Sequence, residues 1–159
     1  MFCSTICVAE KPDNISPNQL RFREMVATRT NTPPIIDGII DEEVWENAII
    51  ENEFVQFEPY NLAAPSEKTE VRLMYDNDFV YIAVNNYDTE PEKITGRLSR
   101  KDRWMEAFGP HSDWVGVAFD SNNDDRTGYW FAVNPAESRM DVYVSDATII
   151  MEAFDSSWD

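Results

Sequence analysis

The sequence predicts an all-β protein, an antiparallel β-sandwich with one short helix near its N-terminal end. Several short segments alternate apolar and polar residues with the period of two that is typical of half-buried strands. Acidic and polar turn residues separate these segments at regular intervals, and only one segment has helical spacing. A chain of 159 residues can hold one domain of ordinary size, which we place at residues 25–159.

The single predicted helix begins after a turn at residues 37–38. Asp41 can cap it, and the acidic residues that follow suit the positive end of the helix dipole. Val44, Trp45 and Ala48 fall at helical spacing and would dock this helix on the core. We therefore expect Trp45 to be a packing residue rather than a ligand contact.

Alternation predicts the strands. Residues 25–30 alternate modestly, and residues 69–75 alternate strictly. Residues 79–87 return as a second β-branched and aromatic run after the turn residues 76–78, which predicts a β-hairpin. Residues 91–97 are expected to form a short helical turn or loop. Three further strands are predicted, at residues 113–120, 128–134 and 140–145.

The residues at the two ends of the chain indicate a signal-peptide remnant at the N-terminal end and an incomplete sandwich at the C-terminal end. Residues 1–9 are apolar and short, end in Ala9 and precede a charged stretch, as the tail of a secretory signal does. We therefore expect residues 1–24 to be the remnant of a signal peptide and a linker; an irregular N-terminus is the alternative. Trp158 has almost nothing after it to hold it in place. A further strand or turn is expected to follow, so that the sandwich is incomplete; a natural short C-terminus is the alternative.

Charge excludes two classes of partner. The chain has 30 acidic and 13 basic residues, a formal net charge of −17. Such a surface repels phosphate backbones and anionic headgroups, so we expect no nucleic acid and no membrane surface as a partner. No apolar run approaches the roughly 20 residues of a membrane-spanning helix. A solvated acidic coat that serves solubility is the alternative explanation of the charge.

Residues 36–48, with the sequence IDGIIDEEVWENA, resemble the N-terminal signature of family 9 carbohydrate-binding modules. The likeness continues in ordered blocks at residues 69–76, 80–84, 112–120 and 127–134. Residues 100–102 and 131–135 are similar to one branch of the family, found at the N-terminus of large bacterial envelope proteins of unknown function. The resemblance implies a jelly-roll sandwich with structural calcium, in a secreted, periplasmic or outer-membrane-associated bacterial protein.

The resemblance also implies sugar-contacting positions. Trp104 matches the first of two tryptophans that stack on a sugar chain end, and Asn134 matches a polar sugar contact. Two other positions depart from the family pattern, because Gly116 stands where the family has a sugar-binding glutamate and Ala132 where it has an arginine. The second stacking tryptophan would lie beyond the end of this sequence. These departures put the sugar site in doubt.

Alternation gives an independent prediction of a binding face. If one set of side chains on two strands faces the core, the other set faces away, with Trp114 and Trp130 on either side of small residues. Aromatic walls over a floor of small residues would let a pyranose ring approach closely. A strand, loop or neighbouring domain that covers this face is the alternative. The expected inward set is Val115, Val117, Phe119, Tyr129, Phe131 and Val133, and the expected outward set is Trp114, Gly116, Ala118, Trp130, Ala132 and Asn134.

The loop at residues 120–126 is rich in oxygen ligands. Asp120, Asn122, Asp124 and Asp125 offer the carboxylates and amide that calcium prefers. The spacing does not match an EF-hand, because the loop has no glycine at the sixth position and no closing glutamate. We expect structural calcium here, and a solvated hairpin turn is the alternative.

The residues provide no catalytic constellation. His111 is the single histidine and has no cysteine or metal-binding spacing around it, and no pair of carboxylates stands out. We therefore expect no enzyme activity in this chain, whether or not the parent protein carries a glycoside hydrolase. A third hypothesis is haem held by His111 with Met74, Met105 or Met140.

Two functions remain open from the sequence. The first is a carbohydrate-binding module that tethers a secreted or envelope protein to a polysaccharide such as xylan or cellulose. The second is a structural or interaction domain that packs against a downstream domain of the same outer-membrane-associated protein, without binding sugar. The replaced residues Gly116 and Ala132 favour the second function.

Overall fold

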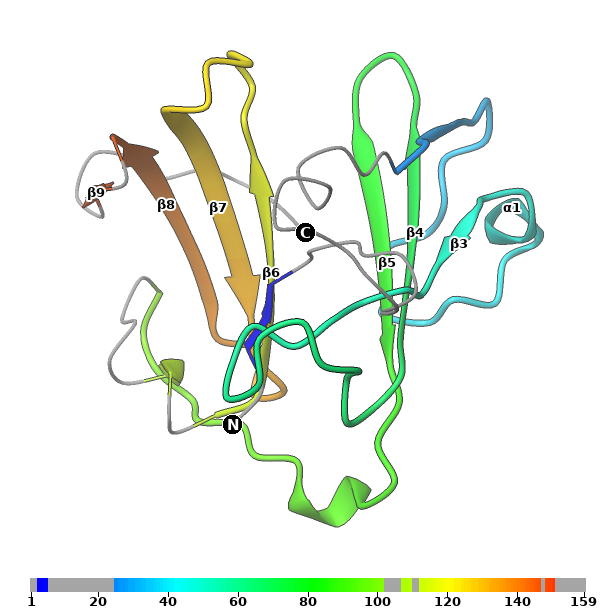
Figure 1. Cartoon of the computed structure of the whole chain (residues 1–159). Coiled ribbons are helices and arrows are strands. Elements are labelled where there is room, and N and C mark those ends of the chain that lie inside the picture. Colours follow the sequence, from blue (N-terminus) through cyan, green and yellow to red (C-terminus); the bar gives the residue numbers. More distant parts are fainter. Residues whose placement is uncertain (1–2, 6–24, 102–106, 110–111, 147, 151–159) are drawn as a thin grey trace. The chain divides into compact units, whose positions relative to one another are not determined.

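The computed structural model describes residues 3–5, 25–101, 107–109, 112–146 and 148–150. These residues form a mostly β structure with two sheets (Figure 1), which confirms the all-β class. The chain divides into two compact units, residues 7–89 and residues 1–6 with 90–159. Within the described part of the chain, no helix has the length and apolarity that crossing a membrane requires.

The sheet of residues 7–89 is built on the predicted hairpin. Strand β4 (Thr69–Tyr75) pairs antiparallel with strand β5 (Val80–Asn86) along its whole length. Two short strands share the other edge of β4: β2 (Thr28–Arg29) pairs with it in parallel, and β3 (Ile50–Glu51) pairs antiparallel. The strand expected over residues 25–30 is therefore limited to two residues.

The turn of the hairpin is fixed by one carboxylate. Asp76 Oδ1 accepts hydrogen bonds from the backbone N–H groups of Asp78 and Phe79, both at 2.8 Å. Asp76 Oδ2 accepts a hydrogen bond from the Tyr81 hydroxyl at 2.7 Å. The bonds from Asp78 and then Tyr81 lower the pKa of Asp76, and the same bond to Asp76, with burial, raises the pKa of Tyr81 to about 12. An aspartate at the start of a turn thus satisfies backbone groups that no ladder partner reaches.

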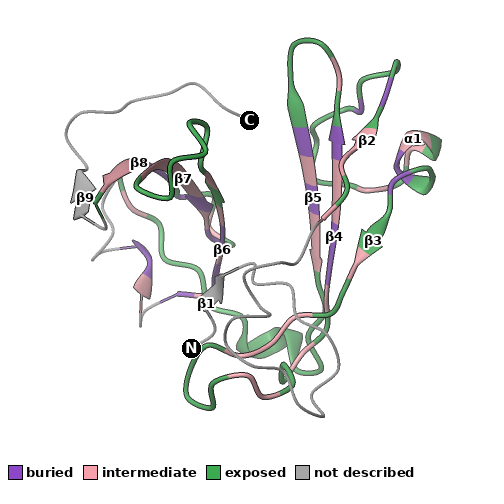
Figure 2. Cartoon of the chain, turned by 45° about the horizontal axis from the view of Figure 1, so that its top comes forward, coloured by how far each residue is buried: buried purple, intermediate pink, exposed green. Residues whose placement is uncertain are grey.

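A single helical turn, α1 (Glu43–Glu46), packs on one face of this sheet. Trp45 is 5% exposed, and it lies with Ala48 against Met74 of β4 and Tyr81 of β5. Both of these strands carry buried segments, which Figure 2 shows in purple. The prediction that Trp45 is a packing residue is confirmed. The predicted cap is wrong, because the N-cap residue is Glu42 rather than Asp41 and it makes no side-chain capping bond. Glu42 Oε1 instead accepts a hydrogen bond from the backbone N–H of Ile35 at 2.7 Å.

The second sheet belongs to the unit of residues 1–6 and 90–159. Its strand order is β1-β6-β7-β8-β9, with every pair antiparallel except β1 and β6. The three strands predicted here are confirmed to within two residues at each end, and residues 91–93 form the expected short helical turn, η2 (Pro91–Lys93). The strands are β1 (Cys3–Thr5), β6 (Trp114–Phe119), β7 (Thr127–Val133), β8 (Arg139–Ser145) and β9 (Thr148–Ile150).

Most residues of the two chain ends lie outside the described part of the structure. Strand β1 lies inside the stretch expected to be a signal remnant, and residues 6–24 lie outside the described part. Trp158 and the rest of residues 151–159 also lie outside it.

Candidate functional site

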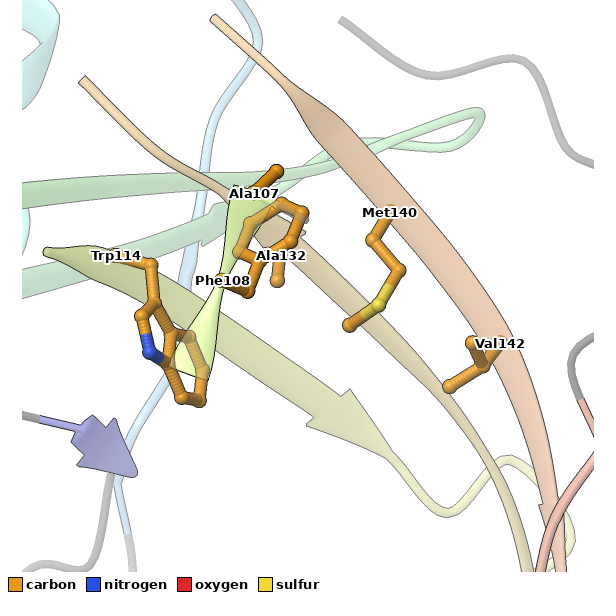
Figure 3. Packing of buried hydrophobic residues seen from close by; sticks show 6 residues of the cluster. All are labelled: Ala107, Phe108, Trp114, Ala132, Met140 and Val142. Carbon is orange, nitrogen blue, oxygen red and sulfur yellow. The ribbon is translucent and has the colours of Figure 1, made fainter. Parts of the chain in front are cut away.

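Most of the tryptophan face of β6 and β7 is buried, contrary to the sequence-based prediction; Trp130 has intermediate exposure and Ala118 is exposed. Trp114 is 7% exposed and Ala132 is 1% exposed, and both belong to one hydrophobic cluster with Ala107, Phe108 and two residues of β8 (Figure 3). The Trp114 ring meets Phe108 edge-on, with ring centroids 6.4 Å apart. The assignment of this face to the outside is therefore wrong, because residues just before β6 cover it.

The small residues of this face have a packing role. Cross-strand register places Gly116 opposite Ala132 and Ala118 opposite Trp130. A Cβ atom on Gly116 would lie 2.5 Å from Trp130 Nε1 and 3.0 Å from Trp114 Cζ3. The two indole rings, whose centroids are 5.6 Å apart, therefore occupy the space above the glycine. Position 116 has no side chain because tryptophan rings of the same sheet pack directly over it. The glycine at this position is therefore explained by packing, without a ligand.

The opposite face of the sheet is half-buried rather than closed. Each of the six residues expected to point inward has intermediate exposure. On the same face, Asp141 has no exposed surface and stands opposite Phe131 in the register. Lys101 Nζ lies 2.9 Å from its Oδ1, and this ion pair compensates the carboxylate for its loss of water. Sequence reasoning missed this pair, because Lys101 is 40 residues from Asp141 in a loop.

Asn134, proposed as a sugar contact, is a buried structural residue with 5% exposure. Its Nδ2 donates to the carbonyl oxygens of Arg97 and Ala107 at 2.8 and 2.9 Å. Its Oδ1 accepts from the backbone N–H groups of Ala136 and Ser138, both at 3.0 Å. An amide side chain has two donor hydrogens and two acceptor lone pairs, so these four bonds engage all of them, and a longer contact of Nδ2 with Ser112 Oγ shares one of the two hydrogens. Asn134 is not free to bind a sugar hydroxyl in this arrangement.

Two buried serines extend the same network. Ser112 Oγ accepts hydrogen bonds from Asn134 Nδ2 and from the backbone N–H of Arg97, both at 3.2 Å. Ser138 Oγ accepts a hydrogen bond from the backbone N–H of Ser99 at 2.8 Å. The network ties the segment before β6 to the turn between β7 and β8, and it keeps the cover of the tryptophan face in place. The serines give no sequence signal of this role, because the partners that tie them into the network lie at least 15 residues away along the chain.

The remaining predicted ligand residues are not brought together. Trp130 is half-buried against the cluster of Trp114, whereas Trp104 lies outside the described residues. For the haem hypothesis, Met74 and Met140 are fully buried and belong to different hydrophobic clusters. His111 and Met105 lie outside the described residues.

The loop at residues 120–126 uses its carboxylates to hold its own backbone. Asp120 accepts hydrogen bonds from the backbone N–H groups of Asn122, Asp124 and Asp125 at 2.8 to 3.2 Å. Asp124 accepts one bond from the Thr127 hydroxyl and one from its N–H, both at 2.7 Å, and these lower the pKa of Asp124. Within the described ranges, no three His, Cys, Asp or Glu side chains are placed to hold a metal ion. Calcium at Asp120, Asn122, Asp124 and Asp125 stays a prediction.

Comparisons with known proteins add no relative, because no protein-family model, curated protein or solved structure matches this chain. The resemblance to family 9 carbohydrate-binding modules therefore stays a prediction that depends on the sequence blocks in residues 36–134.

Proposed function

We propose that the fold of this chain is a β-sandwich of jelly-roll type. A sandwich buries one face of each of two sheets, with inward and outward side chains alternating along every strand. Each sheet has an aliphatic face suited to this. On β4 and β5 it consists of Val71, Leu73, Ile82 and Val84, and on β6 and β7 of Val115, Val117, Phe131 and Val133.

We propose that this chain is a non-catalytic interaction module of a secreted or envelope protein, and that it packs against a polypeptide surface. The observation that carries the proposal is the exposure of large aliphatic side chains around α1. Ile35, Ile36 and Ile39 precede the helix and are 67%, 55% and 58% exposed. Ile49 and Ile50 follow it and are 47% and 45% exposed. Isoleucine is among the most buried residue types, and several exposed ones close together mark an interaction site.

The buried tryptophan face supports a polypeptide partner over a polysaccharide. A sugar platform needs aromatic rings that water reaches, whereas Trp114 is packed against Phe108. The amide of Asn134 is likewise engaged by backbone groups. The partner in this proposal is a downstream domain of the same large protein.

Hydrogen exchange on two samples tests this proposal: the isolated chain, and the longer protein that carries it. The expected result is slower exchange of the amides of residues 35–50 in the longer protein, because a partner domain covers them. Equal exchange of these amides in both samples would contradict the proposal. The amides of residues 120–126 serve as a control, because they lie in an exposed turn of the other unit.

Carbohydrate binding is the second candidate. It is favoured by the partial exposure of Trp130, which lies in one of the sequence blocks that resemble family 9 carbohydrate-binding modules. Titration of the whole chain with xylo- and cello-oligosaccharides, followed by tryptophan fluorescence, separates the two candidates. The interaction proposal predicts no change at millimolar sugar. A saturable change that Trp130→Phe abolishes would establish the carbohydrate function instead.

A further inference from the structure

The surface around α1 carries a strong local charge as well as exposed aliphatic side chains. Between Arg29 and Lys68 the sequence has nine Asp or Glu residues and no Lys or Arg. Asp37, Asp41 and Glu46 in this stretch are exposed. We define the α1 surface as residues 35–50, which hold five exposed isoleucines and five acidic residues without a single basic one.

A hollow of about 410 Å³ opens beside this surface, between α1 and the segment that starts at β2. Glu43 and Val44 of α1 line one side, Thr28 and Thr32 line the other, and the fully buried Met74 also lines it. This volume lies within the range of small-ligand pockets, which is roughly 300 to 1,000 Å³, so it accommodates a long side chain.

The charge of the hollow is negative. Arg29 is also in contact with it, but β2 places Arg29 opposite Tyr75, whereas its neighbour Thr28 is opposite Met74. Successive side chains of a strand point to opposite faces, so the Arg29 side chain points away from the Met74 side. Its guanidinium donates to Asn77 Oδ1 at 2.7 Å and lies 5.8 Å from the centroid of the Tyr75 ring. Glu43 is therefore the charged side chain of the hollow that can interact with a bound group.

These observations define the chemistry of an occupant. The Glu43 carboxylate and the hydroxyls of Thr28 and Thr32 are hydrogen-bond acceptors, which suits an ammonium group with three donors. Val44 and Met74 offer an apolar lining along which the methylenes of a lysine side chain can pack. An acidic rim with exposed isoleucines suits a segment that is both basic and apolar, because complementary charge favours association.

We propose that the α1 surface binds a basic, amphipathic polypeptide segment, with one lysine or arginine side chain of that segment inserted in the hollow beside Glu43. This inference rests on the proposed function as an interaction module and names the chemical class of its partner. Binding is stronger than diffuse charge attraction alone would give, because the inserted side chain meets a carboxylate at a defined place.

The test uses the whole chain and a fluorescein-labelled peptide of alternating lysine and leucine, with binding followed by fluorescence anisotropy at physiological ionic strength. Peptides of alternating glutamate and leucine, and of alternating lysine and glycine, are the controls for charge and for apolar contact. Glu43→Gln removes the charge in the hollow. Glu46→Gln is the matched control, because Glu46 is on the same helical turn and does not line the hollow.

The lysine–leucine peptide is expected to bind, with affinity about fivefold to tenfold lower for Glu43→Gln and changed less than about twofold for Glu46→Gln. Equal effects of the two substitutions, equal binding of the glutamate–leucine peptide, or no binding of the lysine–leucine peptide would each overturn this inference. These outcomes are independent of the hydrogen-exchange test. If residues 35–50 are protected in the longer protein but Glu43→Gln does not change the peptide affinity, the result supports the interaction module and contradicts the proposal of a basic partner.

Discussion

Replacing Gly116 by alanine tests whether the tryptophan rings fill the space above β6. The new Cβ would lie 2.5 Å from Trp130 Nε1, and ordinary contacts begin at 3.4 Å, so this ring has to move by about 0.9 Å. Overpacking of this kind costs about 1–3 kcal/mol. Replacing glycine by alanine also reduces the entropy of the unfolded chain, which offsets about 0.4–1 kcal/mol. With the middle value of each range, the expected net loss in the free energy of unfolding is about 1.3 kcal/mol.

Urea unfolding followed by circular dichroism measures this loss, and thermal unfolding should show a Tm lower by about 2–8 °C. Ala118→Val is the matched control, since Ala118 is on the same strand and exposed, and its effect should stay within about 0.5 kcal/mol. A double-mutant cycle with Trp130→Phe gives the specific evidence, because the smaller ring leaves room for the methyl group. The cost of Gly116→Ala should fall by at least about 0.5 kcal/mol in that background. A neutral Gly116→Ala, or the same cost in both backgrounds, would refute the packing argument.

Three further predictions follow from the hydrogen-bond networks. Asn134→Ala should cost about 2–3 kcal/mol in urea unfolding, because it leaves buried carbonyl and N–H groups without partners; a cost equal to that of the exposed Asn122→Ala would contradict this. The raised pKa of Tyr81, about 12, means that its stabilising contribution is complete below the unfolded value of 10.0 and disappears as the pH rises to about 12. The urea midpoint of the wild type should therefore fall more steeply than that of Tyr81→Phe over this range, and parallel curves would argue against the bond. The pKa of Asp124 is lowered in the folded protein, so its ionised carboxylate stabilises the fold above the unfolded value of 3.8, and this contribution is lost as the pH falls below that value. Asp124→Asn should therefore make stability depend less on pH in acid, and an unchanged acid profile would contradict this.

The strands were predictable because their alternation is local. In the hairpin of β4 and β5, one face carries Val71 and Leu73 and the turn begins with Asp76, so period and turn residues agree. The helix was predictable as a docking element from the spacing of Trp45 and Ala48. Its cap was not, because Glu42 bonds to Ile35, seven residues earlier.

The buried side of β6 and β7 could not be predicted from alternation. One face of these strands carries valine and phenylalanine and the other carries tryptophan, alanine and glycine, so both faces are apolar. Periodicity separates the two faces but does not say which of them another segment covers. The cover comes from Ala107 and Phe108, and its attachment depends on Asn134, whose partners are up to 37 residues away. The α1 surface, by contrast, could have been found, since a long stretch without basic residues is visible in the sequence.

The burial of Trp114 is the most direct test of the account, because it separates a packed interior from an open sugar platform. Uniform ¹⁵N labelling and NMR give one indole signal for each tryptophan, and single Trp→Phe variants assign the signals of Trp114 and Trp45. A soluble gadolinium chelate then broadens the signals of indoles that lie at the surface. We expect the Trp114 signal to persist as well as that of Trp45, since these residues are 7% and 5% exposed. Strong broadening of Trp114 with Trp45 unaffected, or a shift of Trp114 on addition of an oligosaccharide, would contradict the account.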